Sequence, residues 1–296
     1  MIVVPESAFE KVMHDLGRYF EKISKIPAAK IVRDALDPVK PKEQLEILSR
    51  YFKNDSLEGK KLLEIGSGYG LFVAVARKEY MVEAYGVEPD GGEGFEGSHF
   101  VSQEIMKVNF LPQEAIIRAA GEKLPFADSS FDIVYSTNVL EHVSDPVQVI
   151  NEAIRVCRPG GVIQIVVPNY GSIFDGHYAC WYLPYQPKWL WKWYLKNILR
   201  RDPGFADTLR TNINYFYLKK VLSPFVASGK VQTLGYGEDV FKERMTHASF
   251  TPWAGLTKIS KILQLAHRLK LVGLATWAMI LIKAYNPIIL TVKKLQ

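Results

Sequence analysis

The feature of this sequence that most constrains the fold is a glycine-rich run at residues 62–70, Leu-Leu-Glu-Ile-Gly-Ser-Gly-Tyr-Gly. A short apolar stretch breaks there into three alternating glycines, Gly66, Gly68 and Gly70. Glycine has no Cβ, so the main chain can adopt positive φ angles and approach a ligand closely. Residues 71–77 continue as an apolar helix whose N-terminus would face the crevice where open parallel sheets bind ligands. The run therefore predicts a strand, a ligand-binding loop and a helix.

An acidic residue, Glu88, closes the next apolar run and lies eighteen residues after Gly70. A carboxylate at this place can accept hydrogen bonds from both hydroxyls of a ribose. Dinucleotide sites use Gly-x-Gly-x-x-Gly, whereas the sixth position here is Leu71. Glu64 would repel a pyrophosphate but suits the amino-acid end of S-adenosylmethionine. The spacing thus favours S-adenosylmethionine over a dinucleotide.

Two longer segments follow in order. Residues 122–146 contain Leu-Pro-Phe and Asn-Val-Leu-Glu-His, and residues 155–168 contain Arg-Pro-Gly-Gly. Together with the glycine run and Glu88, these segments resemble the class I S-adenosylmethionine-dependent methyltransferases over roughly residues 60–170, and most nearly the type-11-like subgroup that includes enzymes of quinone biosynthesis. The resemblance implies S-adenosyl-L-methionine as cofactor and methyl transfer as activity. It does not name the acceptor.

The resemblance also implies a role for each motif residue. The three glycines would form the loop at the methionine end, with Glu64 at the amino-acid group and Glu88 at the ribose. Asn138, at the end of a strand, would lie near the transferring methyl group and contribute to catalysis. We interpret His142 as a residue that lines the cofactor at the start of a helix. No metal is expected, because Glu141 and His142 are too few ligands for a hard divalent ion.

The chain departs from the subgroup just before Leu-Pro-Phe. Members usually carry Gly-Asp-Ala-Glu there, with the Asp bound to the adenine amino group, whereas this chain has Ala119-Ala120-Gly121-Glu122. We therefore expect the adenine to be held by backbone groups near Ala120 and Gly121, or by the side chain of Glu122.

The implied fold is a doubly wound α/β fold with a seven-stranded, mostly parallel, Rossmann-like sheet. Strands are expected at residues 61–65, 83–88, 115–119, 131–136, 161–168, about 230–236 and 288–294, the last of them antiparallel. We expect four regions: an N-terminal helical lid at 1–54, the S-adenosylmethionine-binding domain at 55–169, a helical acceptor-binding insertion at 170–214, and a C-terminal part at 215–296 that completes the sheet and contains a long apolar helix.

The insertion follows the fifth strand at the ligand-binding edge of the sheet, and segments this long normally have a function such as shaping a pocket. Methyl transfer to a hydroxyl needs a group that takes the proton, and a positioned base contributes about 10²- to 10⁴-fold to the rate. His177 lies early in the insertion and is our candidate for that base, with Asp175 to orient it. A purely structural role for His177 is the alternative.

The basic residues of the insertion form a pattern of their own. The chain has a formal net charge of +6, and Lys188, Lys192, Lys196 and Arg200 recur at every fourth position along a Trp-rich segment. A narrow basic stripe on an apolar helix is typical of a helix that lies in a membrane interface, and a packed cap helix is the alternative. Basic residues mixed with Trp do not indicate a nucleic-acid partner.

Membrane contact would be peripheral. Residues 271–282 are uncharged and mostly apolar, but a membrane span needs about 20 residues. Two cysteines are too few for a disulfide framework, and no signal-peptide core follows Met1. We expect a cytoplasmic protein that contacts an anionic membrane at its inner face.

These patterns favour a methyltransferase that modifies a hydroxyl on a sugar, a glycan or a lipid-linked acceptor near a membrane surface. Two alternatives remain open. One is methylation of a small apolar ring such as a quinone, and the other is S-adenosylmethionine binding without turnover.

Overall fold

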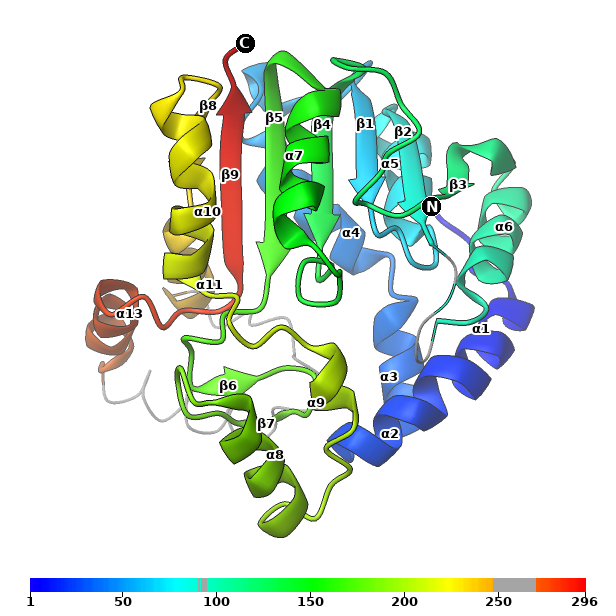
Figure 1. The fold of residues 1–296 in the computed structure, drawn as a ribbon. Coiled ribbons are helices and arrows are strands. Elements are labelled where there is room, and N and C mark those ends of the chain that lie inside the picture. Colours follow the sequence, from blue (N-terminus) through cyan, green and yellow to red (C-terminus); the bar gives the residue numbers. More distant parts are fainter. Residues whose placement is uncertain (90, 92–94, 247–269) are drawn as a thin grey trace.

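The computed structural model describes residues 1–89, 91, 95–246 and 270–296. Seven strands form one sheet in the order β3-β2-β1-β4-β5-β9-β8 (Figure 1). β1 to β5 pair in parallel, and β9 runs antiparallel to β5 and β8. The predicted sheet with an antiparallel last strand is confirmed. Its strands are β1 (Lys61–Ile65), β2 (Glu83–Glu88), β3 (Ile116–Arg118), β4 (Phe131–Thr137), β5 (Cys157–Val167), β8 (Val231–Gly235) and β9 (Ile288–Lys294).

Two apolar faces of the sheet are each covered by helices. Side chains alternate between the faces of a strand, so neighbouring residues of β1 enter different cores. Leu63 packs in a core with α7 (Pro146–Val156), whereas Leu62 packs in a core with α4 (Val39–Ser49) and α5 (Leu71–Tyr80). Figure 1 shows α7 in front of the sheet and α4 and α5 behind it. Glu64, two residues after Leu62, therefore faces the α4 and α5 layer.

The N-terminal segment forms helices near the carboxyl ends of the parallel strands (Figure 1). α1 (Glu6–Val12), a π-helical turn (Met13–Gly17) and α2 (Arg18–Ser24) follow one another directly, and α3 (Ala28–Ala35) comes next. Helices were expected over residues 1–54, and the buried residues of these helices include Val12, Leu16 and Ile23. The role of the segment as a lid remains a prediction.

The insertion lies beyond the same strand ends, between β5 and α10 (Tyr215–Ala227) (Figure 1). It contains the helices α8 (Lys188–Asn197) and α9 (Phe205–Thr208). It also contains a small hairpin that the sequence pattern did not indicate, formed by β6 (Phe174–Asp175) and β7 (Cys180–Trp181).

The basic stripe is shorter than the sequence predicted. Lys188, Lys192 and Lys196 lie on α8, but the helix ends before Arg200, which has a φ of 52°. The prediction that Arg200 continues the stripe is therefore wrong, because the chain leaves the helix first.

The C-terminal part completes the sheet, as expected. α11 (Glu238–Thr246) follows β8, and α13 (Val272–Leu281) precedes β9. The apolar helix predicted at residues 271–282 is confirmed by α13. Among the described residues, no helix has both the length and the apolar character needed to cross a bilayer.

Candidate active site

The loop after β1 has the backbone geometry that its glycines predicted. Gly66, Gly68 and Gly70 have φ angles of 75°, 48° and 70°. A Cβ on Gly66 would lie 2.2 Å from Cγ2 of Val139, in the loop after β4. A side chain at Gly66 would therefore collide with that loop, and the positive φ angles would strain any other residue.

The predicted ribose residue, Glu88, contacts this loop directly. It is buried at the end of β2, and the Gly68 N–H donates a hydrogen bond of 2.8 Å to Oε2 of Glu88. Among the described residues, a Cβ built on Gly68 would meet only Phe95, at 3.9 Å, so these residues leave space above the loop. The backbone of Gly68 and the carboxylate of Glu88 therefore lie together at the place where the nucleoside part of a ligand was expected.

Glu64 supplies a second carboxylate on the same side. Its Oε2 is buried and has no hydrogen-bond partner among the described residues. Burial, reinforced by the nearby charge of Glu88, holds the pKa of Glu64 well above its usual range. A buried carboxylate with a free acceptor is suited to a cationic group, because an opposite charge would offset its burial. This environment is compatible with the amino group of S-adenosylmethionine, and contact of Glu64 with that group remains a prediction.

The segment expected to hold the adenine, residues 119–122, lies next to the end of β2. The Ala119 N–H donates to the carbonyl of Glu88 at 3.3 Å, which places the 119–122 segment beside the ribose residue. The Glu122 carboxylate accepts hydrogen bonds from Ser144 N–H at 3.1 Å and from Ser144 Oγ at 2.9 Å. Because Glu122 is occupied by Ser144, backbone groups at Ala120 and Gly121 are the better candidates of the two alternatives.

Asn138 lies at the junction of two parts of the site. It is exposed at the end of β4, has a φ of 53°, and its N–H donates to Val166 at 2.9 Å. Its neighbour Val139 packs on Gly66, while Asn138 itself lines a cavity of about 520 Å³. The short loop after β4 thus connects the glycine loop to this cavity.

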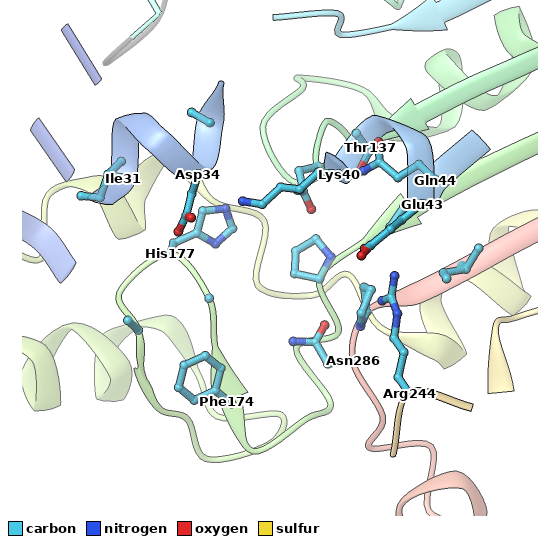
Figure 2. Close-up of a pocket in the computed structure, with 18 of the residues that line it drawn as sticks. Ile31, Asp34, Lys40, Glu43, Gln44, Thr137, Phe174, His177, Arg244 and Asn286 are labelled. Carbon is cyan, nitrogen blue, oxygen red and sulfur yellow. The ribbon is translucent and has the colours of Figure 1, made fainter. Parts of the chain in front are cut away.

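The cavity has charged, amide and apolar walls (Figure 2). Asp34, Lys40, Glu43 and Arg244 line it, two of each sign. Figure 2 shows Lys40 pointing toward Asp34 and His177, and Glu43 pointing toward Arg244. Further lining residues carry amides (Gln44, Gln164, Asn286) or aromatic rings (Phe20, Phe174, Phe241).

His177 lines the same cavity, where sequence reasoning placed the candidate base. Nδ1 of His177 lies 3.6 Å from Oδ2 of Asp175, and the other oxygen of Asp175 accepts a hydrogen bond of 2.7 Å from Tyr178 N–H. The turn between β6 and β7 brings Asp175 and His177 together, which is the arrangement expected of a base and the residue that orients it.

The side chains of Glu141 and His142 lie next to the imidazole ring of His177. Nε2 of His177 and Nε2 of His142 each lie 3.9 Å from Oε1 of Glu141. The two imidazole rings are 5.4 Å apart, and Phe205 packs against both. His142, expected to line the cofactor, thus lies beside the candidate base, and its contact with the cofactor remains a prediction.

Burial and neighbouring charges shift the pKa values of His177 and Glu141 in opposite directions. Burial alone would lower the pKa of His177, but the carboxylates of Asp175 and Glu141 raise it overall. Burial raises the pKa of Glu141 to about 7, against the opposing charge of His177.

Sequence reasoning missed the cavity charges and the importance of Glu141. Lys40, Glu43 and Arg244 lie on the helices α4 and α11, where isolated charges normally indicate a solvated face. Glu141 was noticed only as half of a Glu-His pair. Nothing in the spacing showed that His177, from the insertion, would complete a group of three.

Comparison with known proteins agrees with this geometry. Residues 63–165 match the family model described as a methyltransferase domain. An "Uncharacterized methyltransferase" of Mycobacterium avium (strain 104) is 39% identical over 123 residues, which cover 42% of this chain and 45% of the relative. A counterpart in Mycobacterium leprae (strain TN) is 40% identical over 120 residues, 40% of this chain and 41% of the relative. The chain thus spans less than half of the length of these relatives.

Solved structures support the fold. A protein of Galdieria sulphuraria proposed to be a sarcosine dimethylglycine methyltransferase is 13% identical, covers 98% of both chains and has a TM-score of 0.52. Phosphoethanolamine N-methyltransferase 2 of Haemonchus contortus, in complex with S-adenosyl-L-methionine, is 16% identical, covers 86% of this chain and 53% of its own, and has a TM-score of 0.50. At these identities the similarity concerns the fold alone.

Proposed function

We propose that this chain, which carries a class I S-adenosylmethionine-dependent methyltransferase domain over residues 63–165, transfers a methyl group to a hydroxyl of an acceptor held in the 520 Å³ cavity. The observation that carries the proposal is the loop after β4. Val139 packs against the glycine loop and Asn138 lines the cavity, so donor and acceptor sites meet at adjacent residues.

Catalysis would rest mainly on positioning. S-adenosylmethionine, when bound, supplies the methyl group as an electrophilic carbon on a positively charged sulfur. The chain's own residues then hold an acceptor oxygen in line with the carbon–sulfur bond, so that a bimolecular step becomes effectively unimolecular. Asn138 stands at the junction where that alignment is made, which fits its expected catalytic role.

The acceptor hydroxyl must also lose its proton. We assign that proton to Nε2 of His177, which lines the cavity, while Asp175 at 3.6 Å from Nδ1 orients the ring. With S-adenosylmethionine bound to supply the methyl group, Nε2 of His177 would take the proton as the acceptor oxygen is methylated. A carboxylate close to the imidazole supports the assignment, because such pairs are common in catalytic sites.

The cavity favours a polyhydroxylated acceptor over an apolar ring. Asp34, Lys40 and Arg244 offer the cavity charged hydrogen-bond donors and acceptors, more than a quinone with its two carbonyl oxygens can use. Hydroxyls of a sugar can both donate to carboxylates and accept from amines. Aromatic walls such as Phe174 suit the apolar faces of the same sugar ring.

A lipid-linked acceptor is supported by the surface of the insertion. Trp189 and Trp193 on α8 are 69% and 53% exposed, and Lys188 and Lys196 lie on the same helix. Lys192 is engaged by Asp207 at 2.5 Å. Exposed indoles beside amines are the composition of a helix that contacts headgroups. We therefore place the chain at a membrane surface when it meets its acceptor.

The test is an assay for formation of S-adenosylhomocysteine. Purified chain is incubated with S-adenosylmethionine and either a lipid extract or a water-soluble extract of cells, and products are examined by mass spectrometry. A lipid-fraction product that gains one CH₂ group on a sugar hydroxyl supports the proposal. A methylated quinone would replace the acceptor we propose, and no S-adenosylhomocysteine with either extract would refute methyl transfer.

A further inference from the structure

We propose that Glu141, His142 and His177 form a binding site for one divalent transition-metal ion, with Zn²⁺ as the best-fitting ion. The site lies where the loop after β4 meets the insertion. It needs no cofactor or acceptor to bind the ion, so it goes beyond the proposed function.

The three side chains already surround one point. One ligand atom from each residue lies within 4.8 Å of the others, and two of the separations are 3.9 Å. Zinc bonds to His nitrogen and carboxylate oxygen are about 2.0 to 2.2 Å long, which corresponds to ligands roughly 3.4 Å apart in a tetrahedral site. The two carboxylate–imidazole separations exceed that value by about 0.5 Å, so both rings would move toward Glu141 when an ion binds.

Glu141 has the burial expected of a metal ligand. Its side chain is fully buried, and neither carboxylate oxygen has a hydrogen-bond partner among the described residues. A buried carboxylate normally has a hydrogen-bond or ion partner, because its burial is otherwise costly. The imidazoles at 3.9 Å are too distant to be hydrogen-bond partners. A cation between Glu141 and the two rings would satisfy all three groups.

The carboxylate of Asp175 lies close to the second ring nitrogen of His177, one of the proposed ligands. Asp175 lies 3.6 Å from Nδ1 of His177, so Nε2 is the nitrogen directed at Glu141. Metal-bound histidines usually donate their other ring N–H to a carboxylate, which fixes the tautomer and orients the ring. Asp175 is the carboxylate nearest to the corresponding nitrogen, Nδ1, of His177 among those described above.

The donor set selects the kind of ion. Two imidazoles and one carboxylate suit Zn²⁺ and other first-row transition metals, whereas Mg²⁺ and Ca²⁺ prefer sets made of oxygens. Counting only the adjacent Glu-His pair had led us to expect no metal. The fold adds His177 from thirty-five residues further along the chain.

Metal binding and the proposed base role use the same nitrogen. A metal on Nε2 of His177 excludes that atom from accepting the proton of the acceptor, so the two states of His177 are mutually exclusive. The amount of bound metal can be measured without methyl transfer. A chain that binds no Zn²⁺ leaves the proposed function intact, and an inactive chain leaves the metal site intact.

The test is calorimetric titration of the full chain with Zn²⁺ after treatment with a chelator. We expect one Zn²⁺ per chain and no comparable binding of Mg²⁺. His142→Ala and Glu141→Gln should each weaken Zn²⁺ binding at least tenfold, and Asp175→Asn should weaken it by about 10- to 100-fold through the orientation of His177. His14→Ala is the matched control, because His14 is an exposed histidine 2.8 Å from an acid, and it should bind Zn²⁺ like the wild type.

Substitution of Glu141 in the core can unfold the protein, so a measurement on the wild type is added. Co²⁺ in place of Zn²⁺ should give the visible absorption of a low-coordinate nitrogen and oxygen site in wild type, and this band should be lost in His142→Ala, whose ring lies partly at the surface. Absence of stoichiometric Zn²⁺ binding by the wild type would overturn the proposal. Unchanged binding by both His142→Ala and folded Glu141→Gln would overturn it too.

Discussion

Replacement of Glu88 by Gln tests the cofactor site with little disturbance of the fold. Glu88 accepts the Gly68 N–H through Oε2 at 2.8 Å. Gln retains a carbonyl oxygen for that bond but has no charge and one acceptor fewer. Removal of the charge also relieves Glu64, whose pKa is raised by burial and by Glu88. We therefore expect the free energy of unfolding to be unchanged or slightly higher, so that any loss of binding reports on the ligand.

The expected size follows from the two ribose hydroxyls. A hydrogen bond to a charged group contributes about 1.5 to 3 kcal/mol, whereas one between neutral groups contributes about 0.5 to 1.5 kcal/mol. Conversion of two such bonds from charged to neutral costs about 2 kcal/mol of binding free energy, which is roughly a 30-fold higher Kd. Glu88→Ala removes both bonds and should weaken binding by at least as much.

Isothermal titration calorimetry with S-adenosylhomocysteine measures this loss. Glu83→Gln is the matched control, because Glu83 begins the same strand with its side chain 53% exposed and bonds to the Tyr85 hydroxyl at 2.8 Å. The control should bind S-adenosylhomocysteine like the wild type. Wild-type affinity in both Glu88 variants would remove Glu88 from the ribose site, and tight binding of NAD by the wild type would refute the cofactor assignment.

Three other variants test different parts of the molecule. His177→Ala, assayed with a chelator present, should lower kcat by about 10²- to 10⁴-fold with unchanged S-adenosylhomocysteine affinity, and full turnover would return His177 to a structural role. A Trp189→Ala and Trp193→Ala double variant should lose salt-sensitive cosedimentation with anionic liposomes, and equal sedimentation of variant and wild type would contradict the membrane role. Arg155→Met removes two hydrogen bonds to Glu152, at 2.7 and 2.8 Å, and three more to Asp128 and to the carbonyls of Leu124 and Phe126, so it should lower the free energy of unfolding by at least about 1 to 3 kcal/mol in urea titration. No change would show that this network adds nothing to stability.

The sheet could be predicted from the sequence because local signals agree with each other there. The run before Gly66 is short and mostly apolar, and it is followed by glycines, which tolerate positive φ angles. The next apolar run is equally short and ends at Glu88. Both features depend on neighbours in the chain. The position of Glu88 beside Gly68 then follows from parallel pairing of β1 with β2.

The acceptor cavity could not be predicted in this way. Lys40 and Arg244 come from helices at opposite ends of the sequence, and only tertiary packing brings them to one cavity. Arg200 was misplaced because a four-residue repeat in the sequence does not show where a helix stops. The cluster of His142 and His177 likewise depends on a hairpin of two-residue strands, too short to leave a periodic pattern.

Trp191 connects the surface of the insertion to the site beneath it. Its side chain is fully buried, and its ring lies 5.3 Å from Tyr178, three residues after Asp175. Successive helical residues are rotated by about 100°, so positions two before and two after Trp191 point to the opposite side of α8. Burial of Trp191 therefore turns Trp189 and Trp193 outward. Because the packing that orients the exposed indoles also supports the turn that carries Asp175 and His177, the proposed membrane contact at α8 would act on the same packed cluster that positions the candidate base.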